Sequence, residues 1–250
     1  IEWIGLSFVR SANDIIELKE HIKKANHHAR VIAKIEKPQA IKNLDAILDA
    51  TDAVMVARGD LGVEIPMQTV PVLQKKITHA CLEKAKPVII ATQMLESMVE
   101  NITPTRAEVN DVANSVMDGA DALMLSGETS VGAFPVQSVE AMHKIVADVE
   151  QEFSGTRAYQ LKERYGQRYI SDAICYHSCK LAEQVGAEAI ITMTHSGYNA
   201  IEISSHRPPC KVFAFTNNHA ILNTLSLVWG VTGFYYDNES STDDTIQDTK

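Results

Sequence analysis

The chain has 250 residues, 45% of them hydrophobic, and a formal net charge of −9 at pH 7. This length and composition suffice for one large domain or two smaller ones, each with a hydrophobic core. The acidic balance, without a basic run, gives no footprint for nucleic acid, and no apolar run approaches the roughly 18 residues that span a bilayer. We therefore expect no nucleic acid and no membrane as partners, and we expect any anion to be bound locally, through a metal ion or focused cations.

Strand-like apolar runs alternate with helical patterns in the first part of the chain. The strands are predicted at Trp3–Ser7, Val31–Glu36, Ala53–Ala57, Val88–Thr92 and Ala122–Ser126. The helical patterns that follow them include Ile15–Ala25, Thr69–Lys84, Arg106–Met117 and Pro135–Val149. Five successive strand–helix units predict a parallel sheet.

Polar residues follow nearly every predicted strand, among them Ser7, Glu36, Asp60, Thr92 and Glu128. An open, doubly wound sheet concentrates its site at one switch point, whereas a barrel draws on many strand ends. We therefore predict an α/β fold that begins with part of a (β/α)₈ TIM barrel, lacking its first strands.

A second domain is predicted after the polar stretch Ser154–Arg168, with the boundary between residues 1–155 and 156–250. Its pattern indicates a smaller α/β domain with helices around Asp172–Gln184 and from Asn218, and strands at Ala189–Met193, Val212–Phe215 and Val231–Tyr235. The tail that follows, residues 238–250, is rich in Asp, Ser and Thr and fits the start of another helix.

The four cysteines, Cys81, Cys175, Cys179 and Cys210, lack a zinc-type CxxC pair. Cys175 and Cys179 are four residues apart, which places them on one face of a helix as ordinary core thiols. This cysteine usage indicates a reducing compartment.

The second predicted strand carries a cation and a carboxylate at its end. Because side chains alternate along a strand, Ile32, Lys34 and Glu36 share one face, and the residues between them form an apolar face. A charge at the end of a buried strand needs a counter-ion, a metal or a substrate. Taken alone, Lys34 and Glu36 are more often an ordinary salt bridge at a barrel mouth than a catalytic pair.

Five segments resemble pyruvate kinase, in the order and spacing of that family. They are Val31–Glu36, Met55–Pro66, Ala91–Met98, Pro104–Glu108 and Met124–Thr129. The resemblance runs through Phe153 and, more weakly, into the second domain. It implies strands four to eight of the family's barrel and most of its C-terminal regulatory domain. Since Ile1 stands inside a strand-like run, we expect a fragment whose natural start lies upstream.

The resemblance also implies an activity, namely phosphoryl transfer from phosphoenolpyruvate to ADP, giving pyruvate and ATP. Glu36 and Asp60 would hold the divalent cation, Mg²⁺ or Mn²⁺, and Lys34 would stabilise the phosphoryl group and the enolate. Gly59 and Asp60 would begin a short helix whose N–H groups accept the substrate carboxylate. Thr92 would lie beside the methylene carbon and help to deliver a proton through water. Lys34 and Thr92 are thus the expected catalytic residues, and both also bind substrate.

Other features of the family are expected outside this set. A K⁺ requirement is implied, with its site largely upstream of this chain, and the intact protein is implied to be a cytoplasmic homotetramer. Thr194, Ser196 and Gly197 occupy a loop that binds a sugar-bisphosphate effector in several relatives, although a plain strand-to-helix turn is the default interpretation. We expect the isolated chain to be inactive, because five strands stand where a barrel needs eight.

Some residues and functions keep two interpretations. Arg58 either pairs with a core carboxylate or contacts substrate directly, and we leave it out of the catalytic set. Thr105 and Glu108 are predicted to form a capping box at a helix start. The alternatives to a pyruvate kinase are another Mg²⁺-dependent barrel acting on pyruvate enolates, such as an aldolase or lyase, and a non-catalytic truncated interaction unit.

Overall fold

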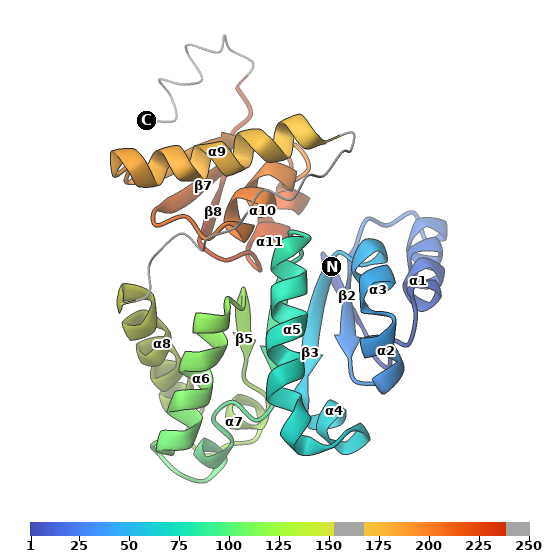
Figure 1. Cartoon of the computed structure of the whole chain (residues 1–250), viewed down its shortest axis with the longest axis vertical. Coiled ribbons are helices and arrows are strands. Elements are labelled where there is room, and N and C mark those ends of the chain that lie inside the picture. The colour runs from blue at the N-terminus through green and yellow to red at the C-terminus, as the bar shows by residue number, and fades with distance from the viewer. Residues whose placement is uncertain (153–167, 239–250) are drawn as a thin grey trace. The chain divides into compact units, whose positions relative to one another are not determined.

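The computed structural model describes residues 1–152 and 168–238 (Figure 1). The chain divides into two compact units, Ile1–Ser154 and Gly155–Lys250, and each is described by itself. The predicted boundary at residue 155 and the predicted helix start after residue 238 lie outside the described residues. Among the helices described, none is long and apolar enough to cross a membrane.

The first unit contains five parallel strands that pair in sequence order. They are β1 (Trp3–Leu6), β2 (Arg30–Ile35), β3 (Ala53–Ala57), β4 (Val88–Ala91) and β5 (Ala122–Met124). All five predicted strands are confirmed, with ends that differ from the prediction by at most two residues. The central strands are the most buried, and β1 and β5 form the two edges.

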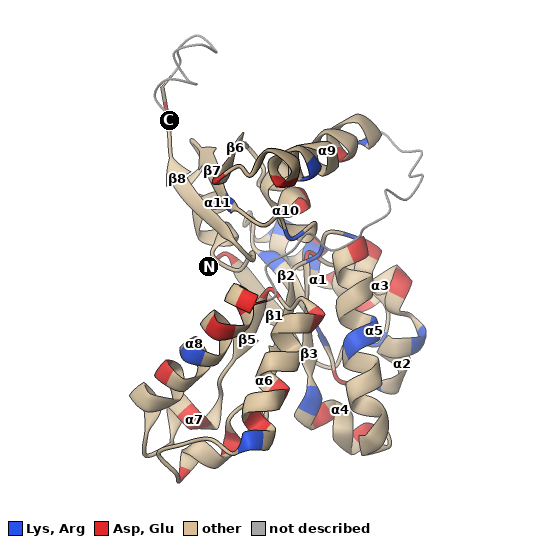
Figure 2. Cartoon of the chain, turned by 60° about the vertical axis from the view of Figure 1, so that its left-hand side comes forward, with Lys and Arg blue, Asp and Glu red and all other residues tan. Residues whose placement is uncertain are grey.

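Helices follow each strand, and they divide into those that cover the sheet and short ones in the loops at the carboxyl ends of the strands. The first group contains α1 (Ala12–Lys24), α2 (Pro38–Lys42), α3 (Leu44–Ala50), α5 (Val70–Glu83), α6 (Arg106–Asp118) and α8 (Pro135–Glu152). The second group contains α4 (Arg58–Glu64), η1 (Met67–Thr69), η2 (Glu96–Val99) and α7 (Gly127–Ser130). Figure 2 shows that charged residues lie mostly on the helices and loops, whereas the strands are mostly uncharged.

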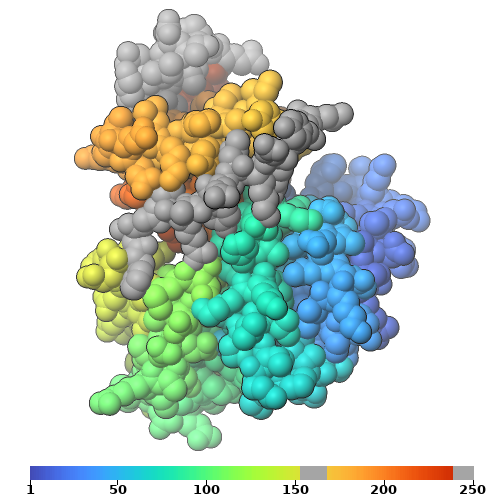
Figure 3. Space-filling view, viewed as in Figure 1, coloured from blue at the N-terminus to red at the C-terminus, as the bar shows by residue number. Residues whose placement is uncertain are grey.

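The core of the first unit joins one face of the sheet to the helices. It contains Val31, Ala33 and Ile35 of β2 and Val54 and Val56 of β3, together with Ile15 of α1, Ile47 of α3, Ile77 of α5 and Val112 of α6. Ile32, Lys34 and Met55 alternate with these strand residues and therefore belong to the opposite face. In the space-filling view, α3, α5 and α6 form the outer surface (Figure 3).

The placement of the helices on one face of the sheet distinguishes a barrel wall from a doubly wound sheet. A doubly wound sheet carries helices on both faces, whereas a barrel wall carries them outside only and pairs its strands in sequence order. The described part of the first unit has its helical core on one face and its strands in sequence order. The predicted wall of a TIM barrel is therefore confirmed.

Carboxylates hold the amino edge of the sheet together. Asp52 Oδ2 accepts a hydrogen bond from the Val31 N–H, and Asp121 Oδ2 accepts one from the Val88 N–H, each at 2.9 Å. Lys86 Nζ donates to the Thr51 carbonyl at 2.7 Å, and burial lowers the pKa of this lysine. The two carboxylate contacts each tie the first residues of one strand to the connection that precedes its neighbour, and the Lys86 contact joins the connections that precede β3 and β4.

The second unit is a smaller α/β fold, as predicted. Its elements are α9 (Tyr169–Val185), β6 (Ala189–Met193), α10 (Tyr198–Ser205), β7 (Lys211–Thr216), α11 (His219–Leu225) and β8 (Val231–Tyr235), and the strands are parallel in the order β6-β7-β8. Cys175 and Cys179 pack against Ile203 and Val212 in its core. Both lie on α9 and are buried, so the prediction of core thiols on one helix face is confirmed. All four cysteines are free.

Candidate active site

The carboxyl end of β2 carries a buried ion pair. Lys34 Nζ lies 2.6 Å from Glu36 Oε1, and the Glu36 side chain is 1% exposed. The segment directly after β1 supplies two more partners. The Phe8 N–H donates to Glu36 Oε2 at 2.7 Å, and Lys34 donates to Ser7 Oγ at 3.0 Å. The predicted pairing of Lys34 with Glu36 is thus present, and the residues after β1 hold both side chains in place.

Neither member of this pair has used all its bonding capacity. Each carboxylate oxygen of Glu36 accepts one hydrogen bond or ion pair and keeps a further lone pair. The Lys34 ammonium has three donors, of which two point to Glu36 and Ser7. The described contacts therefore leave one lone pair on each Glu36 oxygen and one N–H of Lys34 unused.

Asp60 lies at the same edge of the sheet as Glu36. It is exposed, on the first turn of α4, which starts directly after β3. The strands β2 and β3 are parallel and paired as Ile35 with Val56, so their carboxyl ends meet at one edge. Mg²⁺ takes oxygen ligands and is commonly held by one or two carboxylates, with water and phosphate oxygens completing its shell.

The types of the donor groups therefore fit a divalent cation. Glu36 and Asp60 are both carboxylates, and they leave most coordination positions to other ligands. Within residues 1–152 and 168–238, no group of three or more His, Cys, Asp or Glu residues could hold a metal by itself. A closed, all-protein metal cage is thus not found in the described part of the chain.

Thr92, the first residue after β4, has a constrained conformation. Its φ is 69° and that of Gln93 is 54°, both in the left-handed region, which costs of order 1–3 kcal/mol for each non-glycine residue. Its hydroxyl donates to the Ala91 carbonyl at 2.6 Å and accepts the Gly59 N–H at 2.8 Å. The hydroxyl hydrogen is therefore occupied, and what Thr92 offers to a ligand is an oxygen lone pair.

Gly59 contacts Thr92 closely, which explains the residue type. A Cβ on Gly59 would lie 3.3 Å from Thr92 Oγ1, tighter than most real contacts. The Gly59 N–H was expected to be free for a substrate carboxylate, but it donates to Thr92. The short helix that begins here, α4, is confirmed.

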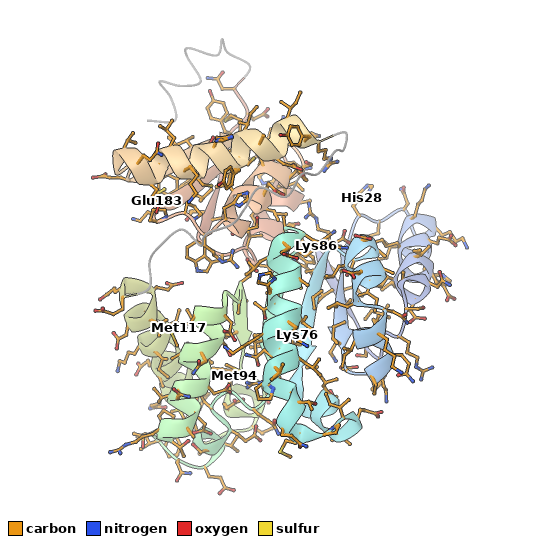
Figure 4. The ribbon with its side chains drawn as sticks, in the orientation of Figure 1. His28, Lys76, Lys86, Met94, Met117 and Glu183 are labelled. Atoms are coloured by element: carbon orange, nitrogen blue, oxygen red, sulfur yellow. The ribbon has the colours of Figure 1, made fainter. Side chains whose placement is uncertain are left out.

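Arg58 has a structural environment that sequence reasoning left open. It is 8% exposed and pairs with both carboxylate oxygens of Asp111, at 2.8 and 2.6 Å. It also donates to the carbonyls of Thr92 and Gln93, and its Nη2 lies 2.9 Å from the sulfur of Met94. Figure 4 labels Met94 in the first unit. Pairing with a carboxylate is thus present, although Asp111 is 38% exposed and not a core residue, and a substrate contact of Arg58 is not tested. Asp111 itself was missed, since it is 53 residues away on α6 and no local pattern connects the two.

Two further carboxylates have structural partners at this edge. Glu108 Oε2 accepts the Thr105 N–H at 2.7 Å, and Thr105 Oγ1 accepts the Glu108 N–H at 3.3 Å, so the predicted capping box is confirmed. Glu128 is 1% exposed and accepts the N–H groups of Leu95 and Ser126. Glu128 therefore connects the segments that follow β4 and β5.

The loop after β6 forms a tight turn in the second unit. Thr194 Oγ1 accepts the Gly197 N–H at 2.9 Å, and Gly197 has a φ of 80°, which favours glycine. Ser196 is exposed beside it. The next residue, Tyr198, donates a short hydrogen bond to Asp172. The three residues of the possible effector loop thus lie in one turn, whose internal contacts are those of a strand-to-helix connection.

Two family models match this chain. Residues 1–139 match the model described as the pyruvate kinase barrel domain, and residues 172–250 match that of the pyruvate kinase alpha/beta domain. The chain belongs to the pyruvate kinase family.

Curated relatives and a solved structure extend this match over the whole chain. A pyruvate kinase from Bacillus licheniformis is 43% identical over 99% of this chain and 42% of its own length. One from Mycobacterium tuberculosis is 44% identical over 99% of this chain and 52% of its own. A crystal structure of a pyruvate kinase from Cryptosporidium parvum has a TM-score of 0.91 at 34% identity, covering 100% of this chain and 52% of that one. The chain thus spans about half the length of these pyruvate kinases.

Proposed function

We propose that this chain carries part of the active site of a pyruvate kinase, which transfers a phosphoryl group from phosphoenolpyruvate to ADP. The observation that carries the proposal is the Lys34–Glu36 ion pair at the carboxyl edge of a barrel wall, with Asp60 after the next strand and Thr92 after the one beyond. Family membership supports the reaction, and this placement supports the residues.

The reaction sets three demands on the site. The bond between the enol oxygen and phosphorus breaks, a bond forms between phosphorus and a terminal oxygen of ADP, and the enolate that remains takes up a proton at its methylene carbon. Catalysis of such a transfer consists mainly of positioning and charge stabilisation. The site must therefore supply positive charge at the phosphoryl group and the enolate, and a proton near the carbon.

Lys34 meets the demand for positive charge. Two of its donors hold Glu36 and Ser7, which fix the direction of the ammonium group. Its third donor is then directed at the substrate, where it stabilises the charge that develops on the phosphoryl group and the enolate oxygen. Because the ammonium is already oriented, little reorganisation is needed during the reaction.

Glu36 and Asp60 would hold Mg²⁺ or Mn²⁺ through the lone pairs that protein contacts leave unused. The bound ion supplies charge neutralisation and orientation for the phosphoryl group. Gly59 and Asp60 are also proposed to bind the substrate carboxylate, in which case the Gly59 N–H is shared between Thr92 and the substrate. K⁺ dependence and homotetramer formation belong to the same proposal. For Thr194, Ser196 and Gly197 a plain strand-to-helix turn remains the default interpretation, and an effector site is the alternative.

Thr92 meets the demand for a proton through water. Its hydroxyl hydrogen goes to the Ala91 carbonyl, so its free lone pair accepts a hydrogen bond from a water molecule. Such a water, held beside the methylene carbon, can give its other proton to the carbon while it takes a proton from the solvent water bonded to it. The four free cysteines support a reducing compartment such as the cytoplasm for this chemistry.

The test is a coupled assay for pyruvate formation from phosphoenolpyruvate and ADP, performed on the natural protein that carries this sequence. Mn²⁺ binding, followed by paramagnetic resonance, is measured in parallel for Glu36→Gln and Asp60→Asn. Both should weaken Mn²⁺ binding at least tenfold. The control is Glu64→Gln, which alters a carboxylate of α4 that pairs with Lys37, and it should leave Mn²⁺ binding unchanged. Absence of pyruvate formation by the wild-type protein would contradict the activity, and unchanged Mn²⁺ binding would contradict the metal ligands.

A further inference from the structure

We propose that Arg58 is a positioning residue for the reaction, because its buried guanidinium holds Thr92 in the conformation that fixes the position of the Thr92 hydroxyl oxygen in the site. The role of Thr92 is part of the proposed function, so this inference rests on it. Arg58 itself is 8% exposed, and side-chain and main-chain acceptors of the protein hold its guanidinium nitrogens, which supports a positioning role.

Thr92 is held at both of its polar groups by consecutive residues of the chain. The Arg58 Nη2 and Nε atoms lie 2.7 and 3.2 Å from the Thr92 carbonyl oxygen. The next residue, Gly59, donates its N–H to Thr92 Oγ1 at 2.8 Å. This double contact follows from the sheet register, since Ala57 of β3 pairs with Ala91 of β4, directly before these residues.

The conformation of Thr92 needs such support. Thr92 and Gln93 both have positive φ, a region that β-branched and other non-glycine residues occupy only when their surroundings hold them there. The two carbonyls converge on one nitrogen of Arg58, with Gln93 O at 2.8 Å. A planar guanidinium has several donors in a fixed fork and can bind both carbonyls while it pairs with a carboxylate.

The guanidinium is itself fixed from the other side. Both Asp111 oxygens accept from Nη1, and Gln74 Oε1 lies 3.4 Å from the same nitrogen. Gln74 in turn donates to Ser115 Oγ on α6. Arg58 thus links Thr92 to α5 and α6, and a lysine in its place has one compact ammonium that cannot reach the carbonyls and Asp111 in the same geometry.

The experiment compares Arg58→Lys, Thr92→Ala and the double variant in the natural protein, with Arg30→Lys as control. Arg30 is a half-buried arginine at the amino end of β2, where it lies over the Trp3 ring. Arg58→Lys should lower kcat at least tenfold while KM for phosphoenolpyruvate changes by less than about threefold. In the Thr92→Ala background the same change should lower kcat by less than about twofold, since the two act as a unit. Arg30→Lys should leave kcat unchanged.

A second measurement does not depend on turnover. Hydrogen exchange of a peptide that contains Gly59 reports its N–H bond to Thr92, and Arg58→Lys should accelerate it about tenfold or more, unlike Arg30→Lys. If Arg58→Lys fails to fold by circular dichroism, Asp111→Ala, which removes the anchor of Arg58, is used and should change kcat and exchange in the same direction.

Three results would overturn the inference. The first is a folded Arg58→Lys variant with wild-type kcat. The second is unchanged hydrogen exchange of the Gly59 N–H in that variant. The third is a pair of kcat losses from Arg58→Lys and Thr92→Ala that multiply in the double variant. The wild-type assay separates this failure from that of the proposed function. An inactive wild-type protein contradicts both, whereas an active one with any of these three results contradicts the role of Arg58 alone.

Discussion

Lys34 and Glu36 form a 2.6 Å ion pair in which the lysine is 26% exposed and the glutamate 1%. The cation therefore faces the open side of the site, and the carboxylate lies behind it. Removing Lys34 would leave the Glu36 carboxylate buried without a counter-ion, which is costly. Lys34 thus has two proposed roles, pairing with Glu36 and stabilising the transition state, and steady-state kinetics can test the second.

Lys34→Met should lower kcat by about 100-fold or more and change KM for phosphoenolpyruvate far less. The reason is that charge on the transferring phosphoryl group and the enolate develops mainly in the transition state, where an oriented cation contributes most. Steady-state kinetics by the coupled assay measures both constants. Lys37→Met is the matched control, because Lys37 pairs with Glu64 and lies over the Phe8 ring nearby. Equal losses in the two variants, or a raised KM at unchanged kcat for Lys34→Met, would contradict transition-state stabilisation by Lys34.

Gly59→Ala should lower kcat, whereas Gly62→Ala should raise thermal stability, although both glycines lie in α4. A Cβ at Gly59 would lie 3.3 Å from Thr92 Oγ1 and displace the hydroxyl, so kcat should fall about tenfold. A Cβ at Gly62 would lie 3.8 Å from a Val70 methyl, an ordinary contact, and alanine in a helix is favoured over glycine by roughly 0.5–1 kcal/mol. Thermal unfolding and kcat of both variants check this, and a fully active Gly59→Ala enzyme would contradict it.

Glu108→Gln should destabilise the first unit at neutral pH but not in acid. Burial raises the pKa of Glu108, but hydrogen bonds from Ser97 and Thr105 outweigh it, and the net pKa is lowered. Its stabilising contribution is thus complete above the unfolded pKa of about 4.3 and is lost as pH falls through the lower folded pKa. Because solvent screens this site, the loss at pH 7 should be at most about 1 kcal/mol.

Urea unfolding between pH 3 and 7 measures that difference. The two curves should converge towards pH 3, and Glu140→Gln, at an exposed position on α8, should follow the wild type throughout. A Glu108→Gln penalty that is the same at pH 3 and pH 7 would show that the carboxylate charge is not involved.

Thiol reagents at pH 8 should modify Cys210 first in the native protein. Burial raises the pKa of Cys175 and Cys179 to about 12, and it also raises the pKa of Cys81, so almost no thiolate is present at these sites. Cys210 is only half-buried, although burial raises its pKa too. Mass spectrometry counts the labels, and Cys210→Ser should remove the fast one. Rapid labelling of Cys175 in folded protein would contradict the core position.

Local patterns predicted the parts of the structure that depend on short sequence separations. The capping box of Thr105 and Glu108 needs only a three-residue spacing, and the shared face of Lys34 and Glu36 needs only the alternation of a strand. The strands were recognised because apolar runs in a parallel sheet are nearly continuous. Such features follow from backbone geometry over a few residues.

Contacts between distant segments could not be predicted in this way. The partners of Arg58 come from α5, α6 and the segment after β4, and the Phe8 N–H reaches Glu36 across 28 residues. The positive φ of Thr92 gave no signal either, because threonine is not a residue type that favours the left-handed region. These arrangements depend on the register of the sheet, which brings strand ends together only after the fold has formed.

Different residues lie at the amino ends and at the carboxyl ends of the strands in the first sheet. At the amino ends, Asp52 and Asp121 hold neighbouring strands through main-chain N–H groups. At the carboxyl ends, Lys34, Glu36 and Thr92 surround the proposed chemistry. Substitutions at the amino ends should therefore alter how long the enzyme survives in the cell, and substitutions at the carboxyl ends how fast it works. Stability and catalytic rate can therefore be changed separately, by substitutions at opposite ends of the strands.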